Sequence, residues 1–147
     1  MNREQAVERL KKHAFLQEDT EDAEAQNGFL GMLRPFQGEL IEENFREVME
    51  ILDVLAEELE QDKLDRTILS CLWGICQYGR AWAVEPDGML RSSELISDEQ
   101  LKQMAQWIDM LSYAVTMLLE GGGREEAFWT YKEYLNEQER IRKKNEF

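Results

Sequence analysis

Histidine and cysteine, the residue types that most often supply bases, nucleophiles and metal ligands, are scarce in this chain. There is one histidine, His13, and there are two cysteines, Cys71 and Cys76. A single histidine near the N-terminus does not supply the partners that a Ser-His-Asp triad or a zinc site requires. The cysteines are separated by about 140° around a helix, so they cannot easily bond to each other. We therefore expect no resident metal and no cofactor, two buried free thiols, and a histidine used in ordinary surface or packing contacts.

Carboxylates are the abundant reactive groups, with 31 Asp and Glu residues against 17 Lys and Arg and a formal net charge of −14. A carboxylate becomes a general acid or base when an apolar pocket raises its pKa, and the sequence places no Asp or Glu clearly in such a pocket. Di-iron sites in helical bundles need Glu-x-x-His pairs, which this sequence lacks. We predict that the protein is not an enzyme. A metal enzyme built from carboxylates alone is the catalytic alternative.

The acidic residues concentrate between positions 39 and 62, where ten Asp and Glu side chains accompany one cation, Arg46. This charge argues against nucleic acid as a direct ligand, because phosphate contacts need Lys and Arg. It leaves a basic protein surface open as a partner. We predict a non-enzymatic protein-binding module that engages a basic partner through the acidic face of helix 39–61. Inhibitor, immunity and chaperone proteins are the types of protein that this prediction includes. The predicted contact residues are Glu43, Glu47, Glu50, Asp53 and Glu57.

The same acidic face has two simpler interpretations. It can be a solvated surface that keeps the protein in solution, or a weak binding site for divalent cations. Like charges three or four residues apart on a helix cost roughly 0.2–0.5 kcal/mol per pair. Burial of the six apolar side chains on the opposite side offsets that cost, at roughly 1.5–3 kcal/mol each.

Two alternative functions depend on other residues. A small-molecule sensor or carrier would use a pocket formed by Trp73, Gln77, Arg80 and Trp107. Arg80 has a plainer interpretation, in which its stem packs on neighbouring aromatic rings and its charged end reaches solvent or a carboxylate. A homo-oligomeric assembly subunit would instead pack the second apolar stripe of helix 98–120 on another copy.

The elements that position these residues are four long helices. Apolar residues alternate steps of four and three along them, as in helices packed lengthwise. Ser97 and Gln100 form a capping box at the start of the third, and turn residues follow the second and third. The predicted fold is an all-α antiparallel four-helix bundle made of helices 39–61, 63–84, 98–120 and 124–144.

Residues 1–38 form the remainder of a predicted single domain that spans 1–147. They comprise a helix from about Asn2 to Leu16, an acidic linker from Glu18 to Asn27, and the apolar connecting segment 29–36. The connecting segment should not stay in water, so we expect it to dock on the bundle of its own chain or on another copy. Either these residues or a second chain must cover the apolar surface that a simple bundle leaves open.

No segment has the length and composition of a membrane span. The longest apolar run, Met110 to Leu119, is too short and contains Ser112 and Thr116. The charged N-terminal residues differ from a signal peptide and from an acid-poor targeting leader. We expect a cytoplasmic protein with no membrane partner, present as a monomer or a homodimer.

Overall fold

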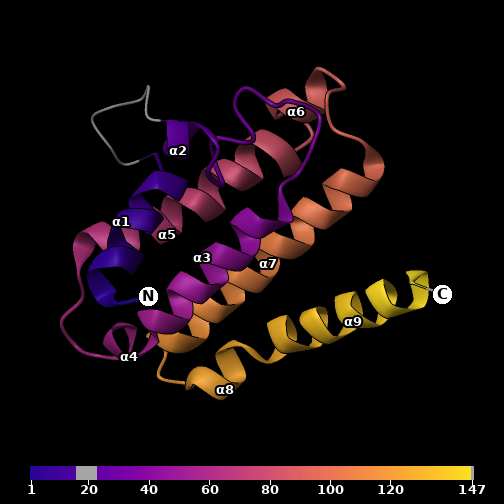
Figure 1. Ribbon diagram of the computed structural model, residues 1–147. Helices are drawn as coiled ribbons and strands as arrows, with labels where there is room; N and C mark the ends of the chain where they lie inside the picture. The colour runs from indigo at the N-terminus through magenta and orange to yellow at the C-terminus, as the bar shows by residue number, and fades with distance from the viewer. Residues whose placement is uncertain (16–22, 147) are drawn as a thin grey trace.

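The computed structural model describes residues 1–15 and 23–146 (Figure 1). Within these ranges the regular structure is helical, apart from an isolated bridge between Leu33 and Phe36. No helix among the described residues is long and apolar enough to cross a membrane. The elements are α1 (Arg3–His13), α2 (Ala23–Gln26), α3 (Glu42–Val54), α4 (Ala56–Leu59), α5 (Arg66–Gly79), the π-helical turn η1 (Arg80–Val84), α6 (Met89–Ser92), α7 (Asp98–Leu119), α8 (Arg124–Ala127) and α9 (Trp129–Asn145).

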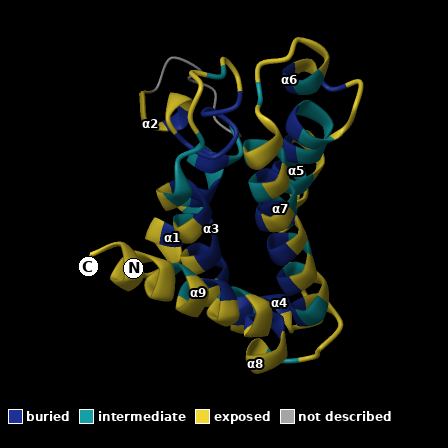
Figure 2. Cartoon of the chain, turned by 90° about the vertical axis from the view of Figure 1, so that its right-hand side faces the viewer, coloured by how far each residue is buried: buried dark blue, intermediate teal, exposed yellow. Residues whose placement is uncertain are grey.

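The core lies between two pairs of helices. α1 packs on α3, α5 packs on α7, and the pairs meet because α1 also contacts α5 and α3 also contacts α7. Figure 2 shows α1 and α3 on one side of the molecule and α5 and α7 on the other. The exposed faces of α3 and α5 therefore point in different directions.

The all-α class predicted from the sequence is confirmed, whereas the predicted bundle of the four long helices is not. The short helix α1 takes part in the core, where Ala6 and Leu10 are fully buried. In α9, by contrast, only Tyr134 is buried. The physical reason is the apolar pattern, because the seam of α9 ends at Leu135 and its next position is the polar Gln138.

Two of the predicted helices have boundaries that differ from the prediction. The predicted helix 39–61 begins at Glu42 and is interrupted at Leu55, between α3 and α4. The predicted helix 63–84 begins at Arg66, because the Asp65 carboxylate caps it by accepting hydrogen bonds from the backbone N–H groups of Thr67 and Ile68. The capping box of Ser97 and Gln100 is present as predicted.

The connecting segment after α2 enters the core of its own chain. Phe29, Leu30, Met32 and Leu33 are buried, and the Phe29 ring lies 6.5 Å from the ring of Trp107. Half of the predicted acidic linker, residues 18–22, lies outside the described residues, and Ala23–Gln26 form α2. The segment supplies apolar cover that the sequence indicated was needed.

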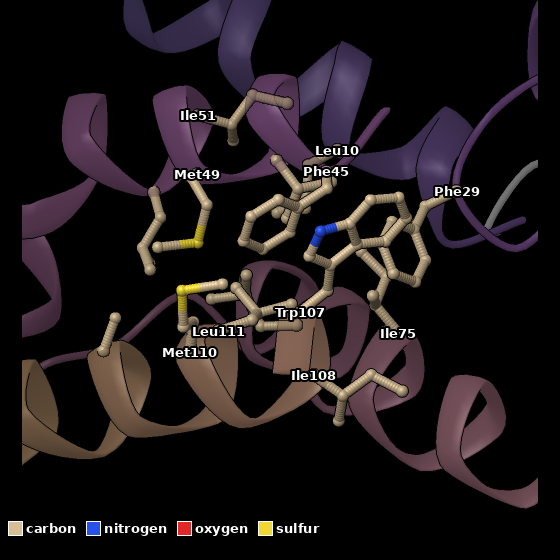
Figure 3. Packing of buried hydrophobic residues seen from close by; sticks show 14 of the residues in the cluster. Leu10, Phe29, Phe45, Met49, Ile51, Ile75, Trp107, Ile108, Met110 and Leu111 are labelled. Atoms are coloured by element: carbon tan, nitrogen blue, oxygen red, sulfur yellow. The ribbon is translucent and has the colours of Figure 1, made fainter. Parts of the chain in front are cut away.

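Trp107 stands at the centre of this core (Figure 3). Its ring stacks on Phe45 at 5.2 Å between centroids, with the planes 6° apart. The indole N–H donates a hydrogen bond of 3.1 Å to the hydroxyl of Tyr134, which in turn donates to Glu42. One residue of α9 is thus tied to both α7 and α3. Met110 is also buried in this core. It belongs to the second apolar stripe of helix 98–120, through which a homo-oligomeric subunit was predicted to assemble.

Candidate interaction surfaces

The outer surface of α3 and α4 carries a row of exposed carboxylates. Glu43 and Glu50 are spaced by seven residues, which places them on nearly the same side of α3, and the exposed Glu57 follows on α4 after the interruption at Leu55. Glu43 and Glu50 make no ion pair within the described part of the chain, and Glu57 is 90% exposed with Arg124 at 3.9 Å. We call Glu43, Glu50 and Glu57 the acidic stripe.

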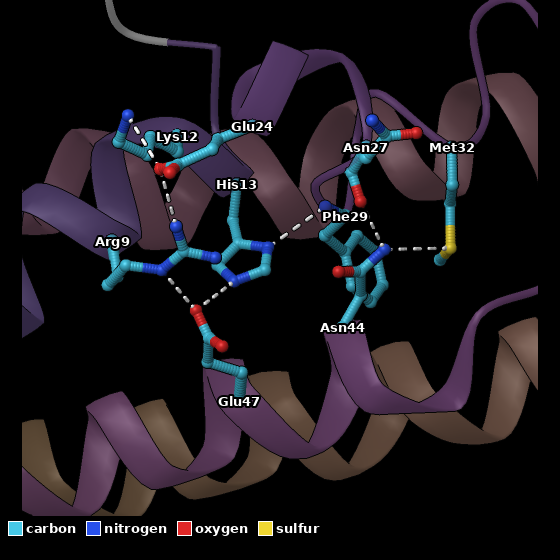
Figure 4. Close-up of polar contacts among 9 residues, drawn as sticks. All are labelled: Arg9, Lys12, His13, Glu24, Asn27, Phe29, Met32, Asn44 and Glu47. Carbon is cyan, nitrogen blue, oxygen red and sulfur yellow. Dashed lines mark hydrogen bonds and ion pairs between the residues drawn. The ribbon is translucent and has the colours of Figure 1, made fainter.

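The other two predicted contact residues are engaged within the molecule. Asp53 pairs with Arg124, whose guanidinium also donates to the Asp53 carbonyl oxygen. Glu47 turns towards α1, where its Oε1 lies 2.6 Å from Arg9 Nε and 3.0 Å from His13 Nε2 (Figure 4). Burial alone would raise the pKa of Glu47, but the hydrogen bonds from Arg9 and His13 lower it below its ordinary value. Of the five predicted contact residues, Glu47 is therefore the one directed away from a partner.

His13 is buried, with 1% of its surface exposed, and it links three parts of the chain. Its Nδ1 accepts a hydrogen bond of 2.9 Å from the backbone N–H of Phe29, so the proton of the neutral ring must be on Nε2, where it is donated to Glu47. Burial lowers the pKa of His13, and the proximity of Glu47 only partly opposes this effect. The histidine is a structural link between α1, α3 and the connecting segment.

The predicted pocket of Trp73, Gln77, Arg80 and Trp107 is not formed by the structure. Trp107 is fully buried in the core, and Arg80 reaches Asp109 of α7 at 3.4 Å. Trp73 and Gln77 remain together on an open groove between α5 and α7 of about 660 Å³. We call it the α5–α7 groove; it is lined by Arg66, Leu69, Ser70, Leu72, Trp73, Gly74, Cys76, Gln77, Tyr78, Ser112, Val115, Thr116 and Leu119.

A second groove borders the acidic stripe. It lies between α3 and the C-terminal helices and has a volume of about 380 Å³. Its walls combine apolar and charged side chains, namely Met49, Glu50, Asp53, Arg124, Phe128, Tyr131, Lys132 and Leu135. We call this second groove the α3–α9 groove. Glu50 belongs both to the acidic stripe and to the lining of this groove.

The titratable groups of the interior are poorly suited to act as nucleophiles. Burial raises the pKa of both thiols, Cys71 and Cys76, to about 11, so they are protonated at neutral pH. Burial, assisted by the hydrogen bond to Glu42, raises the pKa of Tyr134 to about 12. Among the residues that the structure describes, no group of three or more His, Cys, Asp and Glu side chains is arranged to hold a metal ion.

The chain matches no family model, no curated protein and no solved structure.

Proposed function

We propose that the protein is a cytoplasmic, non-enzymatic protein-binding module that engages a basic partner through the acidic stripe. The observation that supports this most is the direction of Arg46, the cation nearest to Glu43 and Glu50 in the sequence. Arg46 lies between Glu43 and Glu50 in the sequence, but its guanidinium pairs with Glu42 at 3.3 Å. The charges of Glu43 and Glu50 are left for solvent or for a partner.

The α3–α9 groove gives such a partner apolar surface beside the charges. Exposed ion pairs contribute only about 0.2–1 kcal/mol each, so three carboxylates alone do not hold a protein tightly. Their main effect is to accelerate and orient association. Met49, Phe128, Tyr131 and Leu135 line the groove next to Glu50 and supply the apolar contact that affinity requires. The partner we infer carries Lys or Arg residues beside an apolar side chain, as a target of an inhibitor, immunity or chaperone protein would.

The proposal is tested by comparing capture from the source cell's lysate by three forms of the protein. The first is the wild type, and the second carries Glu43→Lys, Glu50→Lys and Glu57→Lys. The matched control carries Glu85→Lys, Asp87→Lys and Glu94→Lys, which change the net charge equally at exposed positions away from the stripe. We expect a basic protein to be retained by the wild type and the control, lost from the stripe variant, and released as salt rises.

Equal capture by all three forms would contradict the proposal, and so would retention of partners that are not basic. Loss of capture by both charge variants would attribute binding to net charge rather than to the stripe.

A further inference from the structure

The surface formed by α5 and α7 lacks charge to an unusual degree for this protein. One third of the residues in the chain are charged (33%), yet none lies in Thr67–Gly79 or in Met110–Leu119. These two runs belong to helices that pack on each other and line the α5–α7 groove. Among the residues that the structure describes, Arg66, at the first turn of α5, is the only charged residue that lines it.

The most exposed tryptophan of the described chain stands on this surface. Trp73 is 73% exposed, and Tyr78 and Leu119 beside it are also exposed. Large apolar side chains gathered on one face mark interaction sites, and tryptophan is the residue type that contributes most often to their binding energy. Exposure of these large apolar side chains to water is unfavourable, so their burial by a partner would be favourable.

Gly74 leaves space in the groove that its own chain does not fill. A Cβ added there would meet only the ring of Tyr78, at 3.8 Å. Gly79, five residues further along, differs: a Cβ there would lie 3.1 Å from the side chain of Ile108, so tight packing inside the chain accounts for that glycine. A glycine inside a helix costs about 1 kcal/mol relative to alanine, and among the described residues no close contact accounts for it at Gly74.

We propose that the α5–α7 groove is a homodimer interface, in which Trp73 of each copy lies in the groove of the other beside Gly74. A two-fold axis brings the same patch of both copies into contact. The exposed Trp73 ring of each copy can therefore be buried in the open groove of the other. Each ring fills space, and each groove receives a ring.

Charge favours a second copy as the occupant of this groove. Two molecules of net charge −14 repel each other wherever their acidic surfaces meet, and this face brings together runs without carboxylates. Glu43 and Glu50 of the acidic stripe lie on α3, and Glu57 lies on α4. α3 packs on α1 and α7 and stands on the opposite side of the molecule from α5 (Figure 2). Charges on the far sides of a dimer are separated by more than the roughly 10 Å over which salt screens them. A basic partner, in contrast, finds no carboxylate in this groove.

The test is the mass of the full chain in solution, measured by light scattering across a concentration series. We expect the 17.3 kDa chain to approach twice that mass as concentration rises. Added salt should leave the dimer unchanged or strengthen it, because it screens repulsion between the two acidic molecules. This response is opposite to that expected for capture through the acidic stripe.

Two variants and a matched control locate the interface. Trp73→Ala should weaken dimerisation about 10- to 100-fold, as expected for a central tryptophan. Gly74→Leu should fill the groove and abolish the dimer, while thermal melting shows a monomer at least as stable as the wild type. Trp129→Ala removes another exposed tryptophan, 56% exposed on α9, and should leave the dimer intact.

A wild type that stays at the monomer mass throughout would overturn the proposal, as would a dimer that survives both Trp73→Ala and Gly74→Leu. A dimer lost equally in Trp129→Ala would place the interface elsewhere. The stripe variant with Glu43→Lys, Glu50→Lys and Glu57→Lys should still dimerise, so failure of the proposed function and failure of the dimer are distinguishable.

Discussion

His13 Nε2 lies 3.0 Å from Glu47 Oε1, so the only histidine of the chain is held by a carboxylate of the acidic helix. The same oxygen accepts a hydrogen bond of 2.6 Å from Arg9. Two groups of α1 thus converge on one side chain of α3, and the backbone N–H of Phe29 completes the histidine's contacts. The acidic helix therefore has two roles, with Glu47 holding the fold together and the acidic stripe facing outward.

The histidine link makes stability sensitive to acid. The native pKa of His13 is lowered from its ordinary value of 6.5, so below about that pH the unfolded chain takes up a proton that the native state resists. Glu47 acts in the same direction: its native pKa is lowered from 4.5, so the stability it contributes above that pH is lost as pH falls through the native value. We expect the free energy of unfolding, measured by urea denaturation, to fall from pH 7 to pH 5 more steeply than in His13→Gln.

Comparison with His13→Gln is needed because protonation of the other carboxylates relieves repulsion and changes stability in both proteins. Parallel pH profiles for the wild type and the variant would show that His13 does not titrate differently on folding.

Glu47 and Glu43 should respond differently to the same substitution. Glu47→Ala removes hydrogen bonds from a charged group and from a buried ring, so we expect it to lower the free energy of unfolding by about 1.5–3 kcal/mol. Glu43→Ala, at an exposed position on the same helix, should change it by less than about 0.5 kcal/mol. Chemical denaturation measures both. Equal effects would mean that the contacts of Glu47 with α1 do not stabilise the protein.

The hydrogen bond from Trp107 to Tyr134 should matter although α9 is largely exposed. Tyr134→Phe leaves the buried indole N–H without its acceptor, and an unsatisfied buried donor costs about 1–3 kcal/mol. Tyr131→Phe on the same helix is the control, because its hydroxyl makes no hydrogen bond to any of the described residues; we expect a change of less than about 0.5 kcal/mol. Tryptophan fluorescence during urea unfolding reports both changes, and a neutral Tyr134→Phe would contradict this assignment.

Two glycines should respond to alanine with opposite signs. A Cβ at Gly88 would lie 2.3 Å from the carbonyl oxygen of Ala81, so the backbone after the π-helical turn would have to move. We expect Gly88→Ala to cost about 1–3 kcal/mol. Gly74→Ala should instead stabilise the isolated monomer by about 0.5–1 kcal/mol, because among the described residues the added Cβ meets only the Tyr78 ring, at an ordinary contact distance of 3.8 Å. Thermal melting at low protein concentration compares the two.

The sequence predicted the helical class and several helix ends, because four-three apolar spacing and capping residues are local signals. The role of His13 also had a signal: Ala6, Leu10 and His13 follow each other at steps of four and three, which places the histidine on the buried face of α1. The polar Gln138 after Leu135 was a local signal that α9 would be mostly exposed, whereas no local pattern indicated that α1 would pack in the core.

The site residues were harder to assign. The acidic residues of helix 39–61, and likewise the two tryptophans of the predicted pocket, were grouped by residue type and not by the direction in which each side chain leaves its helix. Glu47 lies only about 40° around the helix from Glu43, so periodicity does not separate them, and the position of α1 decides which one is engaged. Trp73 and Trp107 do differ in direction. Trp73 is about 200° from Cys71 on its helix and faces outward, whereas Trp107 follows Met104 on the buried seam and faces the core.

The central claim is tested most directly by the association rate between the protein and its captured basic partner, measured at several salt concentrations. Neutralising the stripe with Glu43→Gln, Glu50→Gln and Glu57→Gln should slow association at low salt by about 10-fold or more, with a smaller effect on dissociation and convergence with the wild type at high salt. Equal association rates at every salt concentration, or a partner whose binding does not depend on salt, would contradict recognition through the acidic stripe.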